Sequence, residues 1–479
     1  MDKNNNSIRV RIAPSPTGYL HIGTARTALF NYLFARANHG SFLLRIEDTD
    51  LERSRDIMTE SIKSGLNWLN LGWDEDVVYQ SDHFDNYRER AFELLKRGKA
   101  YWCYCTPKEI EERKKKALNS HKRWMYDRRC YNLKEKERKD FEREGRPKAL
   151  RFRIPPGVTE YKDLIHGGIK RDNSEIEDFV ILKSDGSPTY NMAVVVDDHR
   201  MEITHVMRGD DHIPNTPKQI LLYKAFGWKP PEFAHFPLIL GKDRSKLSKR
   251  KNAVAISEYR DKGFLPEAMV NYLAFLGWSP KTKEEIFSLS ELVERFTLKS
   301  INQKPAIFDL ERLEWVNRKW MNRLKEEEIA KRLQHYLKEK GIDVQNREYI
   351  IKIVRAMGNR VKKFQDFIQL GYYFFSDDFS LDEKGASEHF YPGLSRRMRQ
   401  LVDRLEELEP FNREGIEEVL RGLSQELGCR SAELIHPVRL GISGMTFGPG
   451  IFILMEVLGK KRVINRLQSL IEYLKGEEK

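Results

Sequence analysis

The first fifty residues change from an alternating pattern to a helical one and back again. Residues 8–12 alternate apolar side chains with arginines, as a strand does, and the proline-rich residues 14–18 end that strand. Apolar side chains then recur every three or four residues up to Gly40, which we expect to cap a helix, and residues 42–46 indicate a second strand. This order predicts a parallel βαβ unit.

Strand patterns return in the middle of the chain. Apolar or alternating runs at residues 150–154, 179–183, 190–196 and 233–240 each predict a strand. Between the last two runs, Pro217 at the start and Gly227 beyond the end bound a predicted helix that begins at Thr216. The predicted fold class is therefore α/β with a parallel sheet.

Beyond about residue 265 the strand patterns stop and amphipathic helical patterns take over. Pro449 and Gly459 bound a further apolar helical run. We expect an α/β body of roughly 320 residues followed by an all-helical domain. The other helices are predicted at residues 326–340, 349–370, 394–409 and 416–427.

Chain length and composition predict several domains and a polyanionic partner. A chain of 479 residues exceeds the roughly 250 to 300 residues that one hydrophobic core holds, so several domains are expected. The 84 Lys and Arg residues outnumber 72 Asp and Glu, and the net charge of +12 favours a polyanionic partner such as nucleic acid. Residues 106–150 alone hold 16 Lys and Arg against 9 Asp and Glu. This segment interrupts the α/β pattern and indicates a basic insertion.

No segment predicts a membrane span or an export signal. The longest uncharged apolar stretch, residues 440–455, has 16 residues and is interrupted by glycines and a proline, so it is too short to cross a bilayer. Residues 1–7 are polar and lack the apolar core of a signal peptide. We therefore expect a cytoplasmic protein without membrane partners.

Three of the four cysteines are clustered. Cys103, Cys105 and Cys130 lie within 28 residues, whereas Cys429 is far away and is interpreted as a small helix residue. Without a secretion signal, such a cluster favours a metal over disulfides, with metal-free thiols as the alternative. Tetrahedral zinc would need a fourth ligand, for which His121 is a local candidate.

Residues 14–24 lie between the first strand and its helix and carry His21, Gly23 and Thr24. A helix N-terminus after a strand attracts phosphates through its amides and its dipole. His21 could add a donor, and Gly23 would let a nucleotide approach the backbone closely. The alternative is a loop in which the histidine is merely capped and the glycine merely turns the chain.

Residues 242–251 hold six Lys or Arg interleaved with serines. A cationic loop of this kind can neutralise the charge that develops on a triphosphate. The alternative is a solvated charge run, which is the commoner fate of such tracts.

Taken together, His21-Ile22-Gly23-Thr24 and Lys246-Leu247-Ser248-Lys249-Arg250 resemble the HIGH and KMSKS signatures of class I aminoacyl-tRNA synthetases. Roughly residues 8–470 resemble the bacterial glutamyl-tRNA synthetase family. Further matching segments are residues 11–18, 45–50, 188–191, 196–199, 208–212 and 449–452.

The resemblance implies a Rossmann-like parallel-sheet catalytic domain with an inserted acceptor-binding subdomain, followed by an all-helical anticodon-binding domain. We place the two halves of the catalytic domain at residues 1–100 and 191–324, the second with the stem region that bears the KMSKS segment. The insertion then covers residues 101–190, with the zinc site, and the helical domain covers residues 325–479. An all-helical end favours glutamate over glutamine, because the related glutaminyl enzymes carry β-barrels there.

The resemblance also implies a reaction. L-Glutamate and ATP would give glutamyl-adenylate and pyrophosphate, and glutamate would then pass to the 3′-terminal adenosine of tRNA(Glu). An enzyme that also glutamylates tRNA(Gln) is the alternative. Mg²⁺ is the expected companion of ATP, although no carboxylate cage is evident, and a monomer is expected. A nucleotidylyltransferase would need neither the basic insertion nor the helical end, and a non-catalytic relative should have lost His21, Gly23, Lys246 or Lys249.

Glutamate has two carboxylates and one ammonium, so its pocket needs at least two cations and an anion. By resemblance, Arg11 and Tyr190 hold the side-chain carboxylate, and Arg208 holds the α-carboxylate end. Glu47 and Ser15 hold the ammonium, and Ala13 also belongs to this pocket. The resemblance assigns catalysis to His21, Gly23, Lys246 and Lys249 and ATP binding to His21, Gly23, Asp211, Ile239, Lys246, Ser248 and Lys249.

For the metal, the resemblance implies one structural Zn²⁺ on Cys103, Cys105 and Cys130 with Tyr126 as the fourth ligand. Some relatives use a histidine two residues after the last cysteine, but this chain has Asn132 there. The basic and partly aromatic segment around the cysteines suits the acceptor end of tRNA, with its phosphates and unpaired bases.

Overall fold

The structure is a computed structural model, and it describes residues 7–50, 56–120, 124–245, 247 and 255–477. The chain forms two compact units. The first comprises Met1–Arg260 and Pro266–Leu310, and the second comprises Asp261–Leu265 and Glu311–Lys479. No helix among the described residues is long and apolar enough to cross a membrane. The division of the chain at residues 100, 190 and 324 stays a prediction.

The first unit begins with the expected βαβ unit. Strand β1 (Arg9–Ile12) pairs in parallel with β2 (Ser41–Ile46), and α1 (Ile22–Ala37) connects them. Strand β3 (Val78–Tyr79) extends this sheet, also in parallel. The C-cap of α1 is Asn38 rather than Gly40, but the Gly40 N–H does donate to the Ala35 carbonyl in the last turn at 2.8 Å. A Cβ at Gly40 would collide with the Ile8 carbonyl oxygen, so the glycine also allows close backbone approach.

A second sheet has the order β7-β6-β10-β9. Strands β9 (His205–Gly209) and β10 (Glu232–Phe236) are parallel and are joined by α7 (Thr216–Phe226), which ends at Gly227 with φ 77° as predicted. Strand β6 (Val158–Asp163) pairs with β10 and with β7 (Gly167–Asp172). The two sheets meet beside β1, where the Thr204 N–H donates to the Arg9 carbonyl at 2.9 Å. This arrangement confirms a Rossmann-like parallel-sheet fold.

Three predictions about strands in this unit differ from the structure. Residues 190–196 belong to a helix, α6 (Tyr190–Arg200), which packs on α3 (Phe84–Lys96) and α7. Its run from Met192 to Asp198 is buried throughout, so it has no periodicity that separates a helix from a buried strand. The predicted strand at residues 233–240 is split into β10 and β11 (Ile239–Leu240). Strand β11 pairs with β12 (Ala306–Ile307), beyond residue 265 where we expected no strand.

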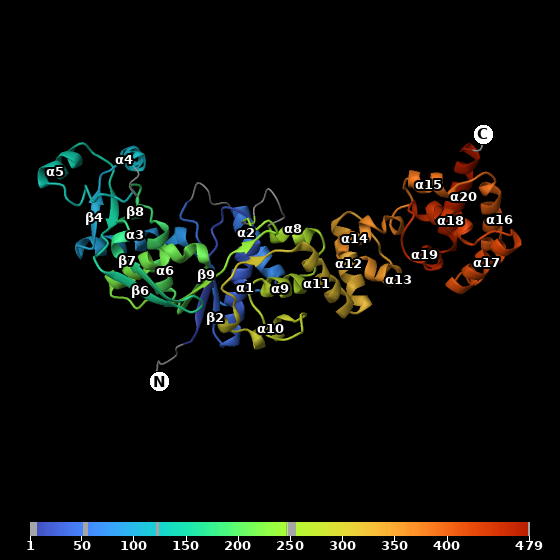
Figure 1. Cartoon of the computed structure of the whole chain (residues 1–479), viewed down its shortest axis with the longest axis horizontal. Coiled ribbons are helices and arrows are strands. Elements are labelled where there is room, and N and C mark those ends of the chain that lie inside the picture. Colours follow the sequence, from blue (N-terminus) through green and yellow to red (C-terminus); the bar gives the residue numbers. More distant parts are fainter. Residues whose placement is uncertain (1–6, 51–55, 121–123, 246, 248–254, 478–479) are drawn as a thin grey trace. The chain divides into compact units, whose positions relative to one another are not determined.

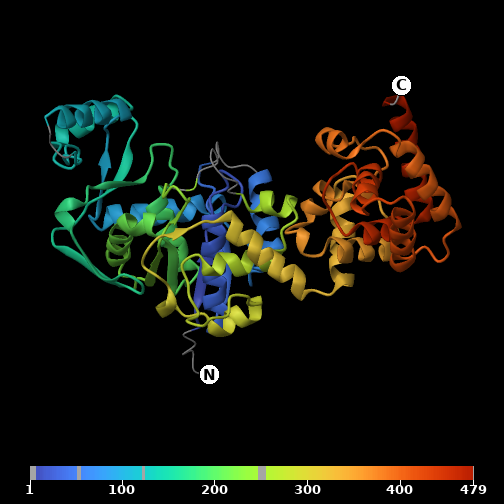
Figure 2. The ribbon, with the colours of Figure 1, turned by 45° about the vertical axis from the view of Figure 1, so that its right-hand side comes forward.

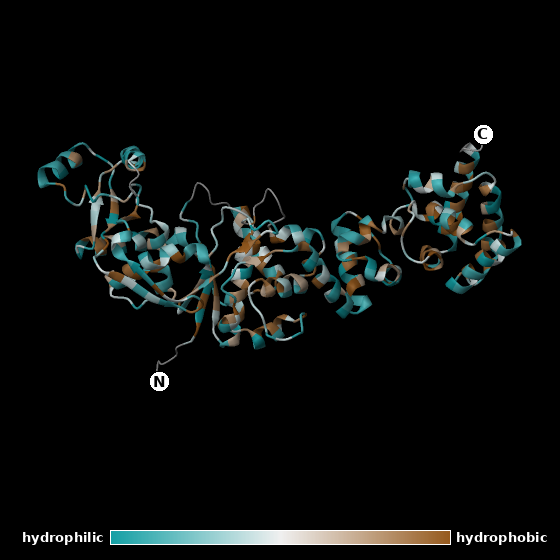
Figure 3. Ribbon diagram, viewed as in Figure 1, coloured by the Kyte–Doolittle hydropathy of each residue, from teal (hydrophilic) through white to brown (hydrophobic). Residues whose placement is uncertain are grey.

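The basic insertion is built on an antiparallel sheet of β4 (Ala100–Cys103), β5 (Ala149–Phe152) and β8 (Phe179–Leu182). Strands β5 and β8 agree with the predicted runs. Helices α4 (Pro107–Asn119) and α5 (Glu135–Arg143) have no buried residue and lie at the end of the unit that is far from α1 (Figures 1 and 2). In Figure 3 the ribbons of these two helices are mostly in the hydrophilic colour, whereas strands near α1 include hydrophobic segments.

The other helices of this unit surround the sheets. They are α2 (Asp56–Trp68), α8 (Ile256–Asp261), α9 (Pro266–Phe275) and α10 (Leu289–Arg295). One buried apolar cluster joins α3, α6 and α7 to β5 and β8. The helices and the insertion thus share buried apolar contacts.

The second unit consists of helices in its described part (Figure 1). The predicted helices at residues 326–340, 394–409, 416–427 and 451–458 are confirmed. The pattern at residues 349–370 is not one helix, because the chain breaks at Gly358, whose φ is 46°. The helices are α11 (Leu310–Arg323), α12 (Glu326–Glu339), α13 (Arg347–Met357), α14 (Phe364–Gln369), α15 (Glu383–His389), α16 (Leu394–Glu407), α17 (Arg413–Glu426), α18 (Ala432–Ser443), α19 (Ile451–Leu458) and α20 (Lys460–Glu477).

Candidate active site and metal centre

A pocket of about 540 Å³ lies at the carboxyl ends of β1 and β9. Crevices at this position, where neighbouring parallel strands diverge in connectivity, are the usual ligand sites of α/β sheets. Every predicted glutamate or ATP residue that the structure describes lines the pocket: Arg11, Ala13, Ser15, His21, Gly23, Glu47, Tyr190, Arg208, Asp211 and Ile239. Lys246, Ser248 and Lys249 lie outside the described residues. Segments distant in sequence thus meet around one cavity.

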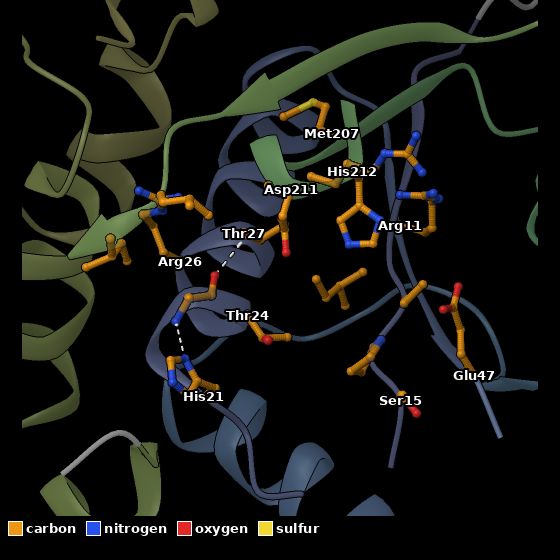
Figure 4. A pocket seen from close by; sticks show the side chains of 18 of the residues that line it. Arg11, Ser15, His21, Thr24, Arg26, Thr27, Glu47, Met207, Asp211 and His212 are labelled. Atoms are coloured by element: carbon orange, nitrogen blue, oxygen red, sulfur yellow. Dashed lines mark hydrogen bonds between the residues drawn. The ribbon is translucent and has the colours of Figure 1, made fainter. Parts of the chain in front are cut away.

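Figure 4 shows two ends of this pocket. His21 and Thr24 lie at the start of α1, whereas Ser15 and Glu47 lie on the opposite side. His21 caps the helix, because its Nδ1 accepts the Gly23 N–H at 3.1 Å. In the neutral ring the proton is therefore on Nε2, which makes that nitrogen a donor. Because this donor and the positive end of the helix dipole lie together, this end of the pocket is suited to phosphates.

The described residues on either side of residues 248–254 lie at the pocket or beside residues that precede α1. Leu247 lines the cavity. Ala255 forms an isolated antiparallel bridge with His21, and the Ile256 N–H donates to the Leu20 carbonyl at 2.9 Å. Leu247 therefore lies at the pocket, and Ala255 lies beside His21 of the first motif.

Arg208 is a buried cation whose hydrogen bonds all go to neutral groups. Its Nη2 donates to the Thr216 hydroxyl and the Gln219 side-chain oxygen, each at 2.8 Å. Its Nη1 lies 3.4 Å from the Tyr190 hydroxyl and its Nε lies 3.3 Å from His235 Nε2. In the described part of the chain no carboxylate forms a salt bridge with it, and burial lowers the pKa of Arg208. A carboxylate ligand would compensate this charge.

Arg11 and Arg45, by contrast, share a buried carboxylate. Arg11 Nε and Nη2 donate to Asp198 at 2.9 and 3.1 Å, and Arg45 Nη1 donates to the same group at 2.6 Å. Burial alone would raise the pKa of Asp198, but the charges of Arg11 and Arg45 lower it to about 2. Asp198 is therefore ionised at neutral pH and holds Arg11 at the edge of the pocket.

Glu47 provides the anion of the pocket. Its carboxylate accepts from Arg45 Nη2 at 3.2 Å, and burial raises the pKa of Glu47 while the charges of Arg45 and Arg11 oppose that rise. Tyr190, at the first turn of α6, shares a hydrogen bond of 2.9 Å with His212 Nδ1. Burial, with the charge of Arg208, lowers the pKa of His212 to about 4, so this ring is neutral at physiological pH.

The supporting residues were not assigned from the sequence. Three of them lie in segments that resemble the family: Arg45 in residues 45–50, Asp198 in residues 196–199 and His212 in residues 208–212. The resemblance therefore pointed to these residues, but it assigned no role to them. Asp163 and His235 lie in no such segment. They were missed because their function depends on contacts between distant strands.

The three clustered cysteines come together in the insertion. The Sγ atoms of Cys103, Cys105 and Cys130 all lie within 4.8 Å of one another, and none forms a disulfide. The Tyr126 hydroxyl lies 3.2 Å from Cys103 Sγ and 3.5 Å from Cys105 Sγ. Thiolates on one tetrahedral zinc at about 2.3 Å would lie about 3.8 Å apart, so this donor set has the right size and chemistry. His121 lies outside the described residues.

Two arginines supply positive charge beside the cluster. Arg113 Nη2 donates to Cys105 Sγ at 2.9 Å, and the Arg151 guanidinium lies 3.9 Å from the centre of the Tyr126 ring. Hydrogen bonds from Cys105 and Cys130, with the charge of Arg151, lower the pKa of the Cys103 thiol, whereas the hydrogen bonds with Cys103 and Cys105 raise the pKa of the Cys130 thiol. The cluster thus shares negative charge that a bound cation would compensate.

Comparison with known proteins agrees with this geometry. Residues 7–315 match the family described as class I tRNA synthetases (E and Q), catalytic domain, and residues 328–471 match the family described as anticodon binding domain. The glutamate–tRNA ligase 1 of Caldanaerobacter subterraneus is 44% identical over 98% of this chain and 98% of its own. The glutamate–tRNA ligase of Geobacter sulfurreducens is 43% identical over 98% of this chain and 99% of its own.

A solved structure extends the likeness to three dimensions. The crystal structure of a glutamate tRNA ligase from Elizabethkingia meningosepticum, in complex with its amino acid, superposes with a TM-score of 0.86 at 34% identity. The alignment covers 98% of this chain and 100% of that chain. The similarity in sequence and structure over nearly the whole length means that the chain belongs to the glutamate–tRNA ligase family of class I tRNA synthetases.

Proposed function

We propose that this chain is a glutamate–tRNA ligase. It activates L-glutamate with ATP to give glutamyl-adenylate and pyrophosphate, and then transfers glutamate to the 3′-terminal adenosine of tRNA(Glu) with release of AMP. The observation that carries the proposal is the buried Arg208, which has no ion pair among the described residues, in the same pocket as the helix-capping His21. A carboxylate amino acid and a nucleotide phosphate are the ligands that these two features accommodate.

The charges around the amino-acid end match glutamate. Arg11, Arg45, Arg200 and Arg208 face Asp197, Asp198 and Glu47, which leaves 4 − 3 = +1. Glutamate carries a net charge of −1 and would neutralise this site, whereas glutamine carries none. A buried charge without compensation is costly, so the pocket selects glutamate.

Within the pocket, Arg208 and Tyr190 bind one carboxylate of glutamate. Their hydrogen bond supports joint action, whereas the resemblance pairs Tyr190 with Arg11. Among the described residues, Asp198 accepts hydrogen bonds from Nε and Nη2 of Arg11. Nη1 of Arg11 therefore remains to bind the other carboxylate of glutamate. Glu47, with Ser15 and Ala13 beside it, binds the ammonium.

The first chemical step needs no protein nucleophile. An oxygen of the glutamate α-carboxylate attacks the α-phosphorus of ATP, the new O–P bond forms, and the bond to pyrophosphate breaks. Catalysis then depends on positioning the reactants and on neutralising phosphate charge. His21 Nε2 donates to the phosphates from one side, and Lys246, Ser248 and Lys249 act from the second motif. Gly23, Asp211 and Ile239 line the nucleotide end.

Mg²⁺ accompanies ATP in this proposal. The described residues contain no cluster of three carboxylate or histidine ligands in this pocket, since the one ligand cluster found is that of the cysteines. The ion would therefore be held mainly by the phosphates, as Mg²⁺ usually is at nucleotide sites.

The two ends of the tRNA bind to different parts of the chain. The helical second unit binds the anticodon, which the match of residues 328–471 supports. The acceptor end binds the insertion, where the sequence concentrates positive charge and where α4 and α5 are exposed. The enzyme acts in the cytoplasm as a monomer.

The decisive test of this function is tRNA charging. We expect labelled glutamate to be attached to purified tRNA(Glu) in an ATP-dependent manner, while labelled glutamine is not attached. Absence of glutamyl-tRNA would contradict the proposal. Charging tRNA(Gln) in parallel distinguishes the broader enzyme, which would glutamylate both tRNAs.

The cysteine site predicts bound zinc. We expect about one zinc per chain after purification without chelators, held by Cys103, Cys105, Tyr126 and Cys130. Cys130→Ser should lose most of the metal, because it removes one of three thiolates, whereas Cys429→Ser should retain it. Elemental analysis by mass spectrometry measures both. A content below about 0.2 zinc per chain in the unmodified protein would reject the site.

A further inference from the structure

His235 joins a carboxylate on one strand to a substrate-binding arginine on another. His235 lies on β10, between Asp163 at the end of β6 and Arg208 on β9. Its Nδ1 lies 2.7 Å from Asp163 Oδ2, and its Nε2 lies 3.3 Å from Arg208 Nε. The three side chains are at most 6% exposed. They form a hydrogen-bonded chain that begins in the insertion and ends in the pocket.

The hydrogen bonds determine which nitrogen of His235 carries the proton. Asp163 Oδ1 accepts the backbone N–H groups of Ile165 and His166, each at 2.9 Å. Burial alone would raise the pKa of Asp163, but the hydrogen bonds from His235 and from these two backbone groups lower it. The carboxylate is therefore ionised, and it can accept hydrogen bonds but cannot donate them. Nδ1 of His235 must therefore be the donor.

The other nitrogen of His235 is then an acceptor. Burial and the charge of Arg208 lower the pKa of His235, although Asp163 opposes this, so the ring is neutral. Neutral Nε2 accepts from Arg208 Nε–H and from the Thr216 hydroxyl, which lies 3.0 Å away. If the ring carried its proton on Nε2 instead, two N–H donors would oppose each other.

We propose that Asp163 and His235 are positioning residues that hold the Nε edge of Arg208, so that its Nη1 stays beside Tyr190 to bind a glutamate carboxylate. Neither residue touches the substrate in this scheme. The proposal deepens the proposed function and depends on it, because it assigns Arg208 to glutamate binding.

The first test is Asp163→Asn. The new side-chain oxygen can still accept from the backbone at Ile165 and His166, but its amide would donate to Nδ1 and move the ring proton to Nε2. We expect the KM for glutamate to rise about 10- to 100-fold. The kcat at saturating glutamate and the KM for ATP should change less than about 3-fold. A partly unfolded variant would instead lose apparent kcat at an unchanged KM.

A conservative variant provides the rescue. In His235→Gln the side-chain oxygen can replace Nε2 as the acceptor, so the KM for glutamate at pH 7.5 should stay within about 3-fold of the unmodified enzyme. His205→Gln is the matched control, because His205 is a half-buried histidine on β9 that does not line the pocket. It should leave the KM for glutamate unchanged.

The pH dependence of the KM for glutamate distinguishes the protonation of His235 from that of the groups around it. The groups around His235 are Asp163 and Tyr161 on β6, Arg208 on β9, Thr216 on α7, and Asp210 and His212 in residues 210–215. Protonation of His235 removes the acceptor, so the KM for glutamate should rise as pH falls through the lowered pKa. The difference between the profiles of the unmodified enzyme and His235→Gln isolates this step.

The outcomes distinguish this inference from the proposed function. If the unmodified chain forms no glutamyl-tRNA, the function itself is wrong. If it does, but Asp163→Asn leaves the KM for glutamate unchanged, only the positioning role is wrong. Nitrogen-15 NMR of labelled histidine gives a direct readout. We expect the His235 proton on Nδ1 in the unmodified chain and on Nε2 in Asp163→Asn, and the same tautomer in both would overturn the inference.

Discussion

Replacing Arg208 by methionine should raise the KM for glutamate by about 100- to 1000-fold, which corresponds to about 3 to 4 kcal/mol of lost binding. The guanidinium is buried, and methionine fills similar space without a charge. Because all hydrogen-bond partners of Arg208 are neutral, the substitution leaves no carboxylate without a partner. The Gln219 oxygen loses its Arg208 donor, which is destabilising, but the removal of an uncompensated buried charge is stabilising, so the free energy of unfolding without glutamate should change by less than about 2 kcal/mol.

The matched control for this prediction is Arg45→Met. Arg45 is also buried, but it binds Asp198 and Glu47. Its removal would leave buried carboxylates uncompensated and should reduce the free energy of unfolding by about 3 to 5 kcal/mol. Steady-state kinetics and denaturant unfolding of both variants measure the contrast. An unchanged KM in Arg208→Met, or equal destabilisation in the two variants, would mean that Arg208 has a structural role rather than a ligand-binding one.

Replacing Lys249 by alanine should slow glutamate-dependent pyrophosphate exchange by about 100-fold, or about 3 kcal/mol of transition-state stabilisation. The lysine charge is needed where negative charge develops on the departing pyrophosphate, so the affinity for glutamate should change less than about 3-fold. Exchange of label between pyrophosphate and ATP measures the first effect, and equilibrium binding of labelled glutamate measures the second.

Lys224→Ala is the control for the loss of a lysine. Lys224 is exposed in the last turn of α7 and does not line the pocket. It should exchange pyrophosphate at the rate of the unmodified enzyme. Normal exchange in Lys249→Ala would remove this lysine from the catalytic group, whereas equal slowing in both variants would indicate a general effect of charge.

Local patterns predicted the elements that carry the motifs. The βαβ unit of β1, α1 and β2 follows from alternation and helical spacing within the first fifty residues. The helix α7 follows from Pro217 and Gly227 at its two ends. These signals are local, because backbone preferences and capping act between residues that are close in sequence.

The same reasoning failed for the run that became α6. Residues 192–196 of this helix are all buried and all apolar, so neither period appears in their sequence. Packing against α3 and α7 decides that it is a helix. This matters for the site, because the helix places Tyr190 in the pocket at its start and Asp198 against Arg11 near its end.

The chemistry of the pocket divides in a similar way. From the sequence alone, the motifs around His21 and Lys249, the cysteines and the candidates for a glutamate pocket could be named, because each depends on residue types in short segments. Only the tertiary structure decided how charge is balanced among them. Asp198 compensates Arg11 across 187 positions, and His235 reaches Asp163 across 72. Burial and pairing depend on which distant strands come together, and that is why the sequence indicated the ligands of this protein while the fold determined which arginine remains available to bind one.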